Sequence, residues 1–282
     1  MKTRTSLVTA LMTAGILGLG AQQAQAAAVA QGWLNVYDFT VTATAPVNTS
    51  GVQNTVDASA DLDGTDATTT GTNQVYQQAV IGPDSGDYNP GVSYLDDPAA
   101  HQYAGGFAEI SGSVLADGAA SLVDTTVALK NPGEGSAQAN SGVTATAIFT
   151  LDAGTLLTFA FTAEGFLRAD LDQPETFAAA DMSWSLALNP RSDVEGGAEF
   201  LWSPTELNRL RSTNTGPYEA LYAFGPTAFE ESFLLGAGTW EMTIRHETNA
   251  DASWQGVPEP ASLTLLGLGL LGLSAMRRRP RA

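Results

Sequence analysis

The stretch "ATAIFTLDAGTLLTFAF" at residues 145–161 decides the predicted fold. Apolar residues occupy every second position on both sides of the sequence Asp152-Ala153-Gly154. They are Ala147, Phe149 and Leu151 before it and Leu157, Phe159 and Phe161 after it. A period of two is the pattern of a half-buried β-strand, and glycine suits a tight turn. The stretch therefore predicts two strands joined as a β-hairpin.

Two later stretches repeat the alternation, residues 181–188 and 239–248. The shared apolar faces consist of Met182, Trp184, Leu186 and Leu188 in the first and of Trp240, Met242, Ile244 and His246 in the second. Further candidate strands span residues 33–44, 106–116 and 121–130, with turn-rich segments at 82–91 and 130–135. Many short strands without alternating helices predict an all-β fold, an antiparallel β-sandwich or jelly roll.

Two segments depart from this strand pattern. Ser203, Pro204 and Glu206 stand in the order of an N-cap, a first helical position and a capping-box glutamate, which predicts one short helix over residues 203–212. Residues 42–78 are poor in bulky apolar side chains and rich in Thr, Ala, Asp and Gly. That composition predicts a long, partly disordered loop.

The first 26 residues have the form of a secretory signal peptide. Lys2 and Arg4 precede an apolar stretch from Leu7 to Leu19, and Ala24 and Ala26 form an Ala-x-Ala cleavage site. Residues 28–30 would also serve as such a site. The expected domains are thus the signal peptide at 1–26, an ectodomain at 27–256 and a C-terminal signal at 257–282.

The charge of the exported part is strongly negative. All 30 Asp and Glu lie between Asp38 and Glu259, together with only six of the 12 Lys and Arg, which gives this interval a net charge of −24. Such a surface repels nucleic acid and anionic membranes and keeps a secreted domain soluble. The chain has no cysteine, which excludes disulfides and thiolate metal sites.

The sequence contains no recognisable catalytic constellation. His101 and His246 are its only histidines, and no nucleophile-elbow or phosphate-loop motif is present. His246 falls on the apolar face of residues 239–248, which favours a core histidine over a catalytic one. A glycoside hydrolase needs only two carboxylates, but the adjacent pairs Asp96-Asp97 and Glu230-Glu231 would point to opposite faces of a strand. We therefore expect no enzyme, no catalytic residues and no cofactor.

Two weaker binding signals remain open. Asp57, Asp61, Asp63 and Asp66 could form a calcium loop, but the glycine and the final glutamate of an EF-hand are missing, so an acidic turn is favoured and no metal site is predicted. Trp33, Trp202 and Trp254 lie near predicted strand ends and could stack on sugars. Core packing explains these tryptophans equally well.

The C-terminus carries three elements in a fixed order. Pro258, Glu259 and Pro260 precede 16 uncharged, mostly apolar residues at 261–276, which are followed by Arg277, Arg278, Arg279 and Arg281. As a helix the apolar run would span about 24 Å, which is short for a hydrocarbon core of about 30 Å. The arginines would stay on the cytoplasmic side of the inner membrane. This pattern favours a temporary membrane anchor.

This C-terminus resembles the PEP-CTERM sorting signal of Gram-negative bacteria. The resemblance implies recognition of Pro258-Glu259-Pro260 by the membrane protease exosortase, after a transient stay in the inner membrane. It also implies delivery to the cell surface or extracellular matrix of a bacterium that makes exopolysaccharide. The ectodomain is similar to exosortase-dependent surface proteins in residues 149–171 and 238–254.

The resulting prediction is an exported, non-enzymatic surface or matrix protein of a biofilm or floc. Its fold would be a β-sandwich with one short helix, flanked by the signal helix and the C-terminal apolar helix. The alternatives are a carbohydrate-binding module, less favourably a glycoside hydrolase, and a permanently C-terminally anchored protein. Absence of an exosortase from the same genome would favour permanent anchoring.

Overall fold

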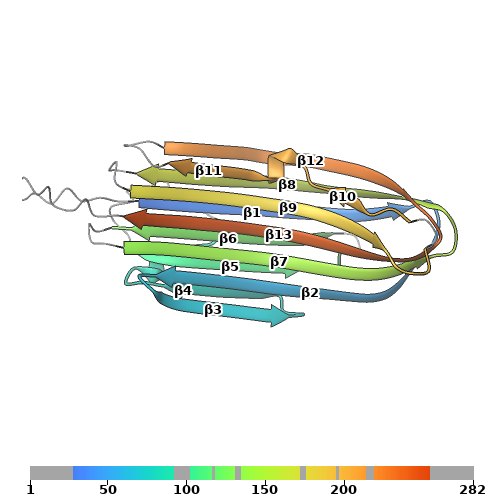
Figure 1. The fold of residues 1–282 in the computed structure, drawn as a ribbon, viewed down its shortest axis with the longest axis horizontal. Helices are drawn as coiled ribbons and strands as arrows, with labels where there is room; N and C mark the ends of the chain where they lie inside the picture. The colour runs from blue at the N-terminus through green and yellow to red at the C-terminus, as the bar shows by residue number, and fades with distance from the viewer. Residues whose placement is uncertain are drawn as a thin grey trace, which may run out of the picture.

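The computed structural model describes residues 28–91, 102–115, 118–130, 135–171, 176–194, 197–213 and 219–254. They form two antiparallel sheets with long strands that run along one axis of the molecule (Figure 1). The first, here called sheet A, has the order β12-β8-β1-β6-β5-β4. Its strands are β1 (Ala28–Ala43), β4 (Tyr76–Ile81), β5 (Tyr103–Ser111), β6 (Ala119–Leu129), β8 (Thr155–Leu171) and β12 (Glu219–Leu235).

The second sheet, here called sheet B, has the order β10-β9-β13-β7-β2-β3, with β11 also paired to β9. Its strands are β2 (Val47–Leu62), β3 (Thr65–Thr72), β7 (Gly135–Leu151), β9 (Thr176–Pro190), β10 (Phe200–Trp202), β11 (Arg209–Thr213) and β13 (Gly238–Trp254). Two single-turn 3₁₀ helices complete the described elements, η1 (Ser85–Asp87) and η3 (Thr205–Leu207). The predicted all-β antiparallel sandwich is confirmed.

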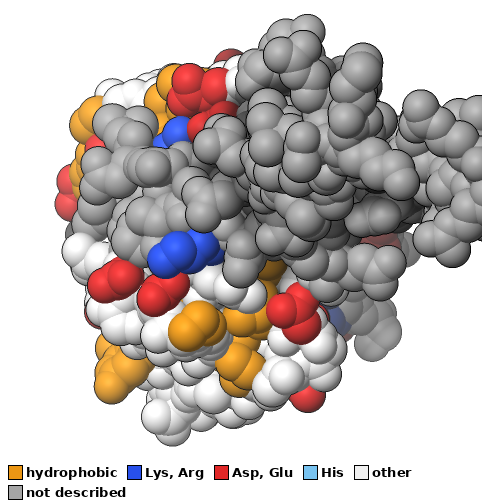
Figure 2. All heavy atoms as spheres, turned by 90° about the vertical axis from the view of Figure 1, so that its left-hand side faces the viewer, with side chains coloured by type: hydrophobic (Ala, Val, Ile, Leu, Met, Phe, Trp, Pro, Cys, Tyr) orange, Lys and Arg blue, Asp and Glu red, His pale blue; other side chains and the backbone are white. Residues whose placement is uncertain are grey.

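The core lies between the two sheets and follows the alternation of the sequence. The predicted apolar faces of β9 and β13 are buried, including Trp184, Trp240 and His246. An aromatic cluster fills the interior, with Phe161 4.6 Å from Trp184 and 5.3 Å from Trp202 between ring centroids. Interlocking rings of this kind add to the free energy gained from burying their area. Acidic side chains appear at several places on the described surface at one end of the sandwich (Figure 2).

The predicted hairpin at residues 145–161 is wrong in its pairing. β7 and β8 are both strands, but β7 belongs to sheet B and β8 to sheet A, so Asp152-Ala153-Gly154 carries the chain from one layer to the other. Phe149 and Phe159 are both fully buried and lie on opposite sides of the core. Alternation fixes which face of a strand is buried, but it does not specify the partner strand.

The predicted loop at residues 42–78 is also wrong, since it contains β2 and β3 and the start of β4. On β2 the buried positions are Val56, Ala58, Ala60 and Leu62. Two of these four positions are alanine, so the alternation of apolar and polar residues was not apparent in the sequence. Asp63 and Gly64 join β2 to β3 with φ values of 53° and 74°, as a two-residue hairpin turn requires.

The predicted helix at residues 203–212 is absent. Its place is taken by the single turn η3 and by β11, which pairs with β9. The Ser203 hydroxyl donates to the Trp184 carbonyl at 3.4 Å and caps no helix. Asn208 donates to the same carbonyl at 2.9 Å, which ties the turn to β9 and lets the chain continue as a strand.

Several predicted features lie outside the described residues. They are the signal peptide with Ala24 and Ala26, the sorting signal with Pro258, Glu259, Pro260, Arg277, Arg278 and Arg279, both flanking helices, Asp96, Asp97, His101 and the Trp254 side chain. In the part of the chain that the structure does describe, no helix is long and apolar enough to cross a membrane.

Candidate functional site

The outer face of sheet B carries a polar trough of about 410 Å³. Its lining comes from five strands and consists of Ser59, Ala60, Asp61, Asp66, Thr68, Gln138, Ala139, Asn140, Asp181, Asn249 and Asp251. Volumes of 300–1,000 Å³ are typical of small-molecule binding clefts. The strands β2 and β13 end close to this trough, at their arrowheads in Figure 1. We refer to this surface as the polar trough.

The strand register explains why these side chains meet. Asn249 of β13 lies between its two partner strands, opposite Asp181 of β9 and Asn140 of β7. Asn140 in turn lies opposite Ser59 of β2. Successive residues of a strand point to opposite faces, so the next row on the same face is two residues away. That row begins with Asp251 and continues through residues 138, 61 and 66, which are Gln, Asp and Asp.

Amide side chains form the middle of the trough and carboxylates form its ends. The Nδ2 of Asn140 donates to Oδ1 of Asn249, whose own Nδ2 donates to Asp181 Oδ1 at 3.0 Å. Gln138 forms a hydrogen bond with Asp251. At the other end, Asp61 and Asp66 face each other across the β2–β3 pair.

Burial and mutual repulsion raise the pKa of three carboxylates on this face. Desolvation raises the pKa of Asp181, against the hydrogen bond from Asn249. Desolvation, and then the charge of Asp181, raise the pKa of Asp251. Asp57, two residues along β2 from the trough, has its pKa raised by desolvation and by Glu247. The charged form of these carboxylates is therefore less stable here than in water. A ligand that carries positive charge would stabilise that charged form.

The four aspartates of the calcium hypothesis are dispersed. Asp61 and Asp66 line the trough, whereas Asp63 occupies the hairpin turn and accepts a hydrogen bond from the Ser136 amide at 3.0 Å. Asp57 lies next to Gly142. Among the described residues, no group of three or more His, Asp or Glu is arranged to hold a metal ion.

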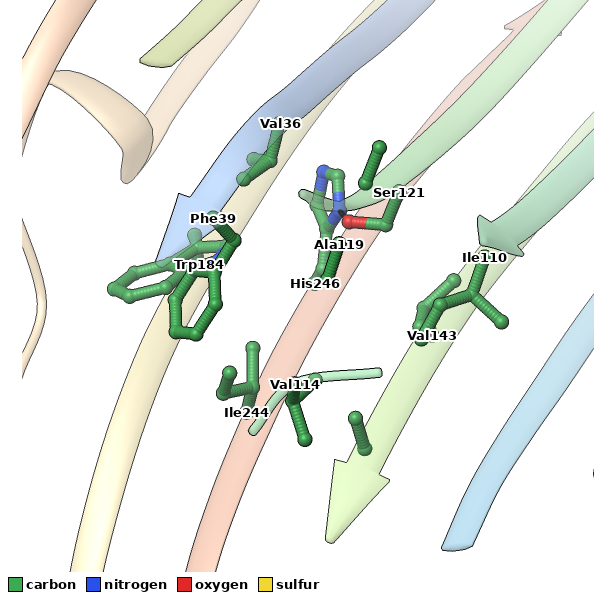
Figure 3. Close-up of a pocket in the computed structure, with 12 residues that line it drawn as sticks. Val36, Phe39, Ile110, Val114, Ala119, Ser121, Val143, Trp184, Ile244 and His246 are labelled. Carbon is green, nitrogen blue, oxygen red and sulfur yellow. Dashed lines mark hydrogen bonds between the residues drawn. The ribbon is translucent and has the colours of Figure 1, made fainter. Parts of the chain in front are cut away.

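His246 lies in the core, as predicted, with none of its surface exposed. Its Nδ1 shares a hydrogen bond of 2.8 Å with the Ser121 hydroxyl. The His246 side chain also borders a cavity of about 20 Å³ that is lined mainly by apolar side chains, among them Phe39 and Trp184 (Figure 3). Desolvation lowers the pKa of His246 to about 3, and the Leu34 backbone acts on the pKa in the opposite direction. The ring is therefore neutral at physiological pH, and a cavity of this size admits about one water molecule.

Trp33 and Trp202, the two predicted tryptophans whose side chains are described, do not share a surface. Trp33 stacks on Phe166 at 6.3 Å in sheet A, whereas Trp202 of sheet B packs edge-on against Trp184 at 5.2 Å. Glu230 and Glu231 are both exposed on β12 of sheet A, whereas the strands that line the trough belong to sheet B. Of the singled-out carboxylates that the structure describes, Asp61 and Asp66 are the ones that line the trough.

A second polar group, missed in the sequence, lies on the outer face of sheet A. Asp124 of β6 is fully buried and accepts hydrogen bonds from the Tyr88 hydroxyl at 3.0 Å, the Gly91 amide at 2.8 Å and the Thr126 hydroxyl at 3.4 Å. Desolvation raises its pKa to about 7 despite these bonds. Tyr88 and Gly91 belong to the segment that follows η1, so their hydrogen bonds to Asp124 hold that segment against sheet A. The only sequence signal was an aspartate within an apolar strand.

Comparison with known proteins addresses the C-terminus. Residues 256–279 match the model of the PEP-CTERM protein-sorting motif, which confirms the resemblance seen at residues 257–282. No curated protein and no solved structure matches the chain. The motif implies export, surface localisation in Gram-negative bacteria and processing by an exosortase. The chain thus carries a PEP-CTERM sorting motif at its C-terminus, and its described part is an acidic β-sandwich.

Proposed function

We propose that the chain is a non-enzymatic component of an extracellular biofilm or floc matrix, associated with exopolysaccharide. The observation that carries this proposal is the PEP-CTERM motif at residues 256–279, attached to a β-sandwich with an acidic surface. The sandwich supplies a rigid, soluble module. Two of its described buried titratable groups are held by neighbours, His246 by Ser121 and Asp124 by Tyr88 and Gly91, which suits structural roles.

The sorting step is tested by intact-mass measurement of the protein recovered from outside the native cells. We expect a mass that lacks residues 261–276 and everything after them. Replacement of Pro258 and Pro260 by alanine should leave the full C-terminus in place and retain the protein in the inner membrane. Recovery of wild-type protein with residues 261–276 still attached would contradict the sorting step and favour permanent anchoring.

The matrix role is tested by deletion of the gene followed by complementation. Cells without the protein should form a weaker floc or biofilm, and the wild-type chain should restore it. The Pro258→Ala/Pro260→Ala chain should not restore it, because it is not delivered. Equal restoration by both chains would count against a role outside the cell.

The second candidate function is carbohydrate binding, and the polar trough favours it. Carboxylate and amide groups form hydrogen bonds to sugar hydroxyls, and the trough has the volume of a ligand cleft. This places the candidate surface on sheet B instead of on the tryptophans. A glycan array with the full chain tests it, and release of reducing ends from a bound glycan would reveal a hydrolase instead.

A further inference from the structure

Amide groups of the polar trough already donate hydrogen bonds within it. Asn140 donates to Asn249, Asn249 donates to Asp181, and Gln138 bonds to Asp251. The carboxylate oxygens can each accept more than one hydrogen bond, so acceptor capacity remains. The trough therefore offers a ligand carboxylate acceptors in addition to the hydroxyls of Ser59 and Thr68.

The charge of the trough points to the same kind of ligand. Four of its eleven lining residues are aspartates, and none is Lys or Arg. A ligand with carboxylate, sulfate or phosphate groups would meet only repulsion there. A ligand with ammonium groups would neutralise carboxylates whose pKa is raised by burial and by one another.

The spacing of the carboxylates requires an extended ligand. Asp181 and Asp251 lie on β9 and β13, whereas Asp61 and Asp66 lie on β2 and β3, with β7 between the two pairs. Neighbouring strands are about 4.8 Å apart, so Asp251 and Asp61 are separated by roughly 10 Å and the whole trough crosses roughly 19 Å. The amide-lined floor between the pairs suits the hydroxyl-bearing part of a ligand that reaches both ends.

We propose that the polar trough binds a saccharide chain that carries free amino groups, with an ammonium at each carboxylate pair and hydroxyls over the amide floor. This inference rests on the carbohydrate-binding candidate and names its ligand class. It distinguishes the ligand from acidic polysaccharides, which the same surface repels.

The test is calorimetric titration of the purified full chain at low and at physiological salt. The probes are glucosamine oligomers, N-acetylglucosamine oligomers of the same length, uronic-acid oligomers, spermidine and calcium chloride. Three variants are compared with the wild type: Asp181→Asn/Asp251→Asn, Asp61→Asn/Asp66→Asn and Glu230→Gln/Glu231→Gln. The last is the matched control, because it removes the same charge from β12 of sheet A.

We expect the glucosamine oligomer to bind at least tenfold more tightly than any other probe. Each trough variant should weaken that binding about tenfold, and the control variant should leave it unchanged. If spermidine bound as tightly as the glucosamine oligomer, the proposal that the ligand is a saccharide would be overturned, since positive charge alone would then explain the binding. Calcium binding that is lost in both trough variants, preference for the uronic-acid oligomer, or equal loss in the control variant would overturn the site itself. None of these outcomes depends on C-terminal processing, so they are separate from a failure of the sorting proposal.

Discussion

The two outer faces of the sandwich both carry carboxylates on their strands, but the hydrogen-bonding needs of these carboxylates are met differently. On sheet A the chain covers its own carboxylate, because Tyr88 and Gly91 close over Asp124. On sheet B the carboxylates of the polar trough remain open to solvent along with their amide neighbours. A polar group that the chain satisfies itself contributes to folding, whereas one left open in a cleft is available to a ligand.

The glycines of the two faces show the same difference. A Cβ atom on Gly105 of β5 would lie 2.8 Å from the Tyr88 ring. Glycine at this position therefore allows the Tyr88 side chain to pack directly against sheet A. The nearest atoms to a Cβ on Gly142 of β7 would be those of the Asp57 carboxylate, at 3.2 Å. Sheet A is therefore packed against its own chain at this point, and sheet B is not.

The largest expected effect is a pH dependence that comes from Asp124. Burial raises its pKa from 3.8 to about 7, so between these values the folded state keeps a proton that the unfolded state has lost. Its contribution to stability is fully present below about pH 4 and is lost as the pH rises through 7, by an amount on the order of a few kcal/mol. Denaturant unfolding of the wild type and of Asp124→Asn from pH 4 to 8 measures this change.

The difference between the two profiles isolates Asp124 from His246, which acts in the opposite direction. The pKa of His246 is lowered to about 3, so its contribution is present above pH 6.5 and is lost as the pH falls toward 3. Relative to the wild type, the Asp124→Asn variant should gain stability as the pH rises. Parallel profiles would show that Asp124 is not sequestered from solvent.

The next effect separates the two glycines. Gly105→Ala should lower the free energy of unfolding by about 2 kcal/mol, because the new methyl group would displace the Tyr88 ring from sheet A. Gly142→Ala should change stability by less than about 0.5 kcal/mol, because a carboxylate can rotate away and alanine suits a strand better than glycine. Chemical denaturation at pH 7 compares them. Equal losses would mean that the outer face of sheet B is as tightly packed as that of sheet A.

The smallest effect concerns the trough itself. Asp181→Asn/Asp251→Asn should raise stability at pH 7 by up to about 1 kcal/mol, since it removes two carboxylates whose pKa is raised by desolvation. The gain should vanish below about pH 4, where the wild-type carboxylates are protonated in both states. Thermal unfolding at pH 4 and 7 measures it, and a clear loss at pH 7 would assign these residues to folding.

The sequence predicts local features of the fold better than its long-range pairing. The buried faces of β9 and β13, the core position of His246 and the sorting motif each depend on contiguous residues, and each was predictable. The pairing of β7 and β8 was not, because alternation says nothing about the partner strand. β2 was missed because alanine, which gives little hydrophobic signal, fills half of its buried positions.

The polar trough could not be predicted, because its residues come from five strands that only the sheet register brings together. Asp61 and Asp66 were noticed as an acidic cluster, but Asp181 and Asp251 are more than 100 residues away in the chain. Asp124 was likewise hidden, since its partners Tyr88 and Gly91 belong to a segment whose place on sheet A depends on tertiary structure.

Carboxyl footprinting with mass spectrometry tests the contrast between the two faces most directly. A water-soluble carbodiimide and an amine label accessible Asp and Glu in the folded full chain, with and without the glucosamine oligomer. We expect Asp61, Asp66, Asp181 and Asp251 to be labelled in the free protein and protected by the oligomer, Asp124 to stay unlabelled in both, and Glu230 and Glu231 to be labelled in both. Labelling of Asp124 as fast as that of the trough aspartates, or protection that does not localise to sheet B, would contradict the account.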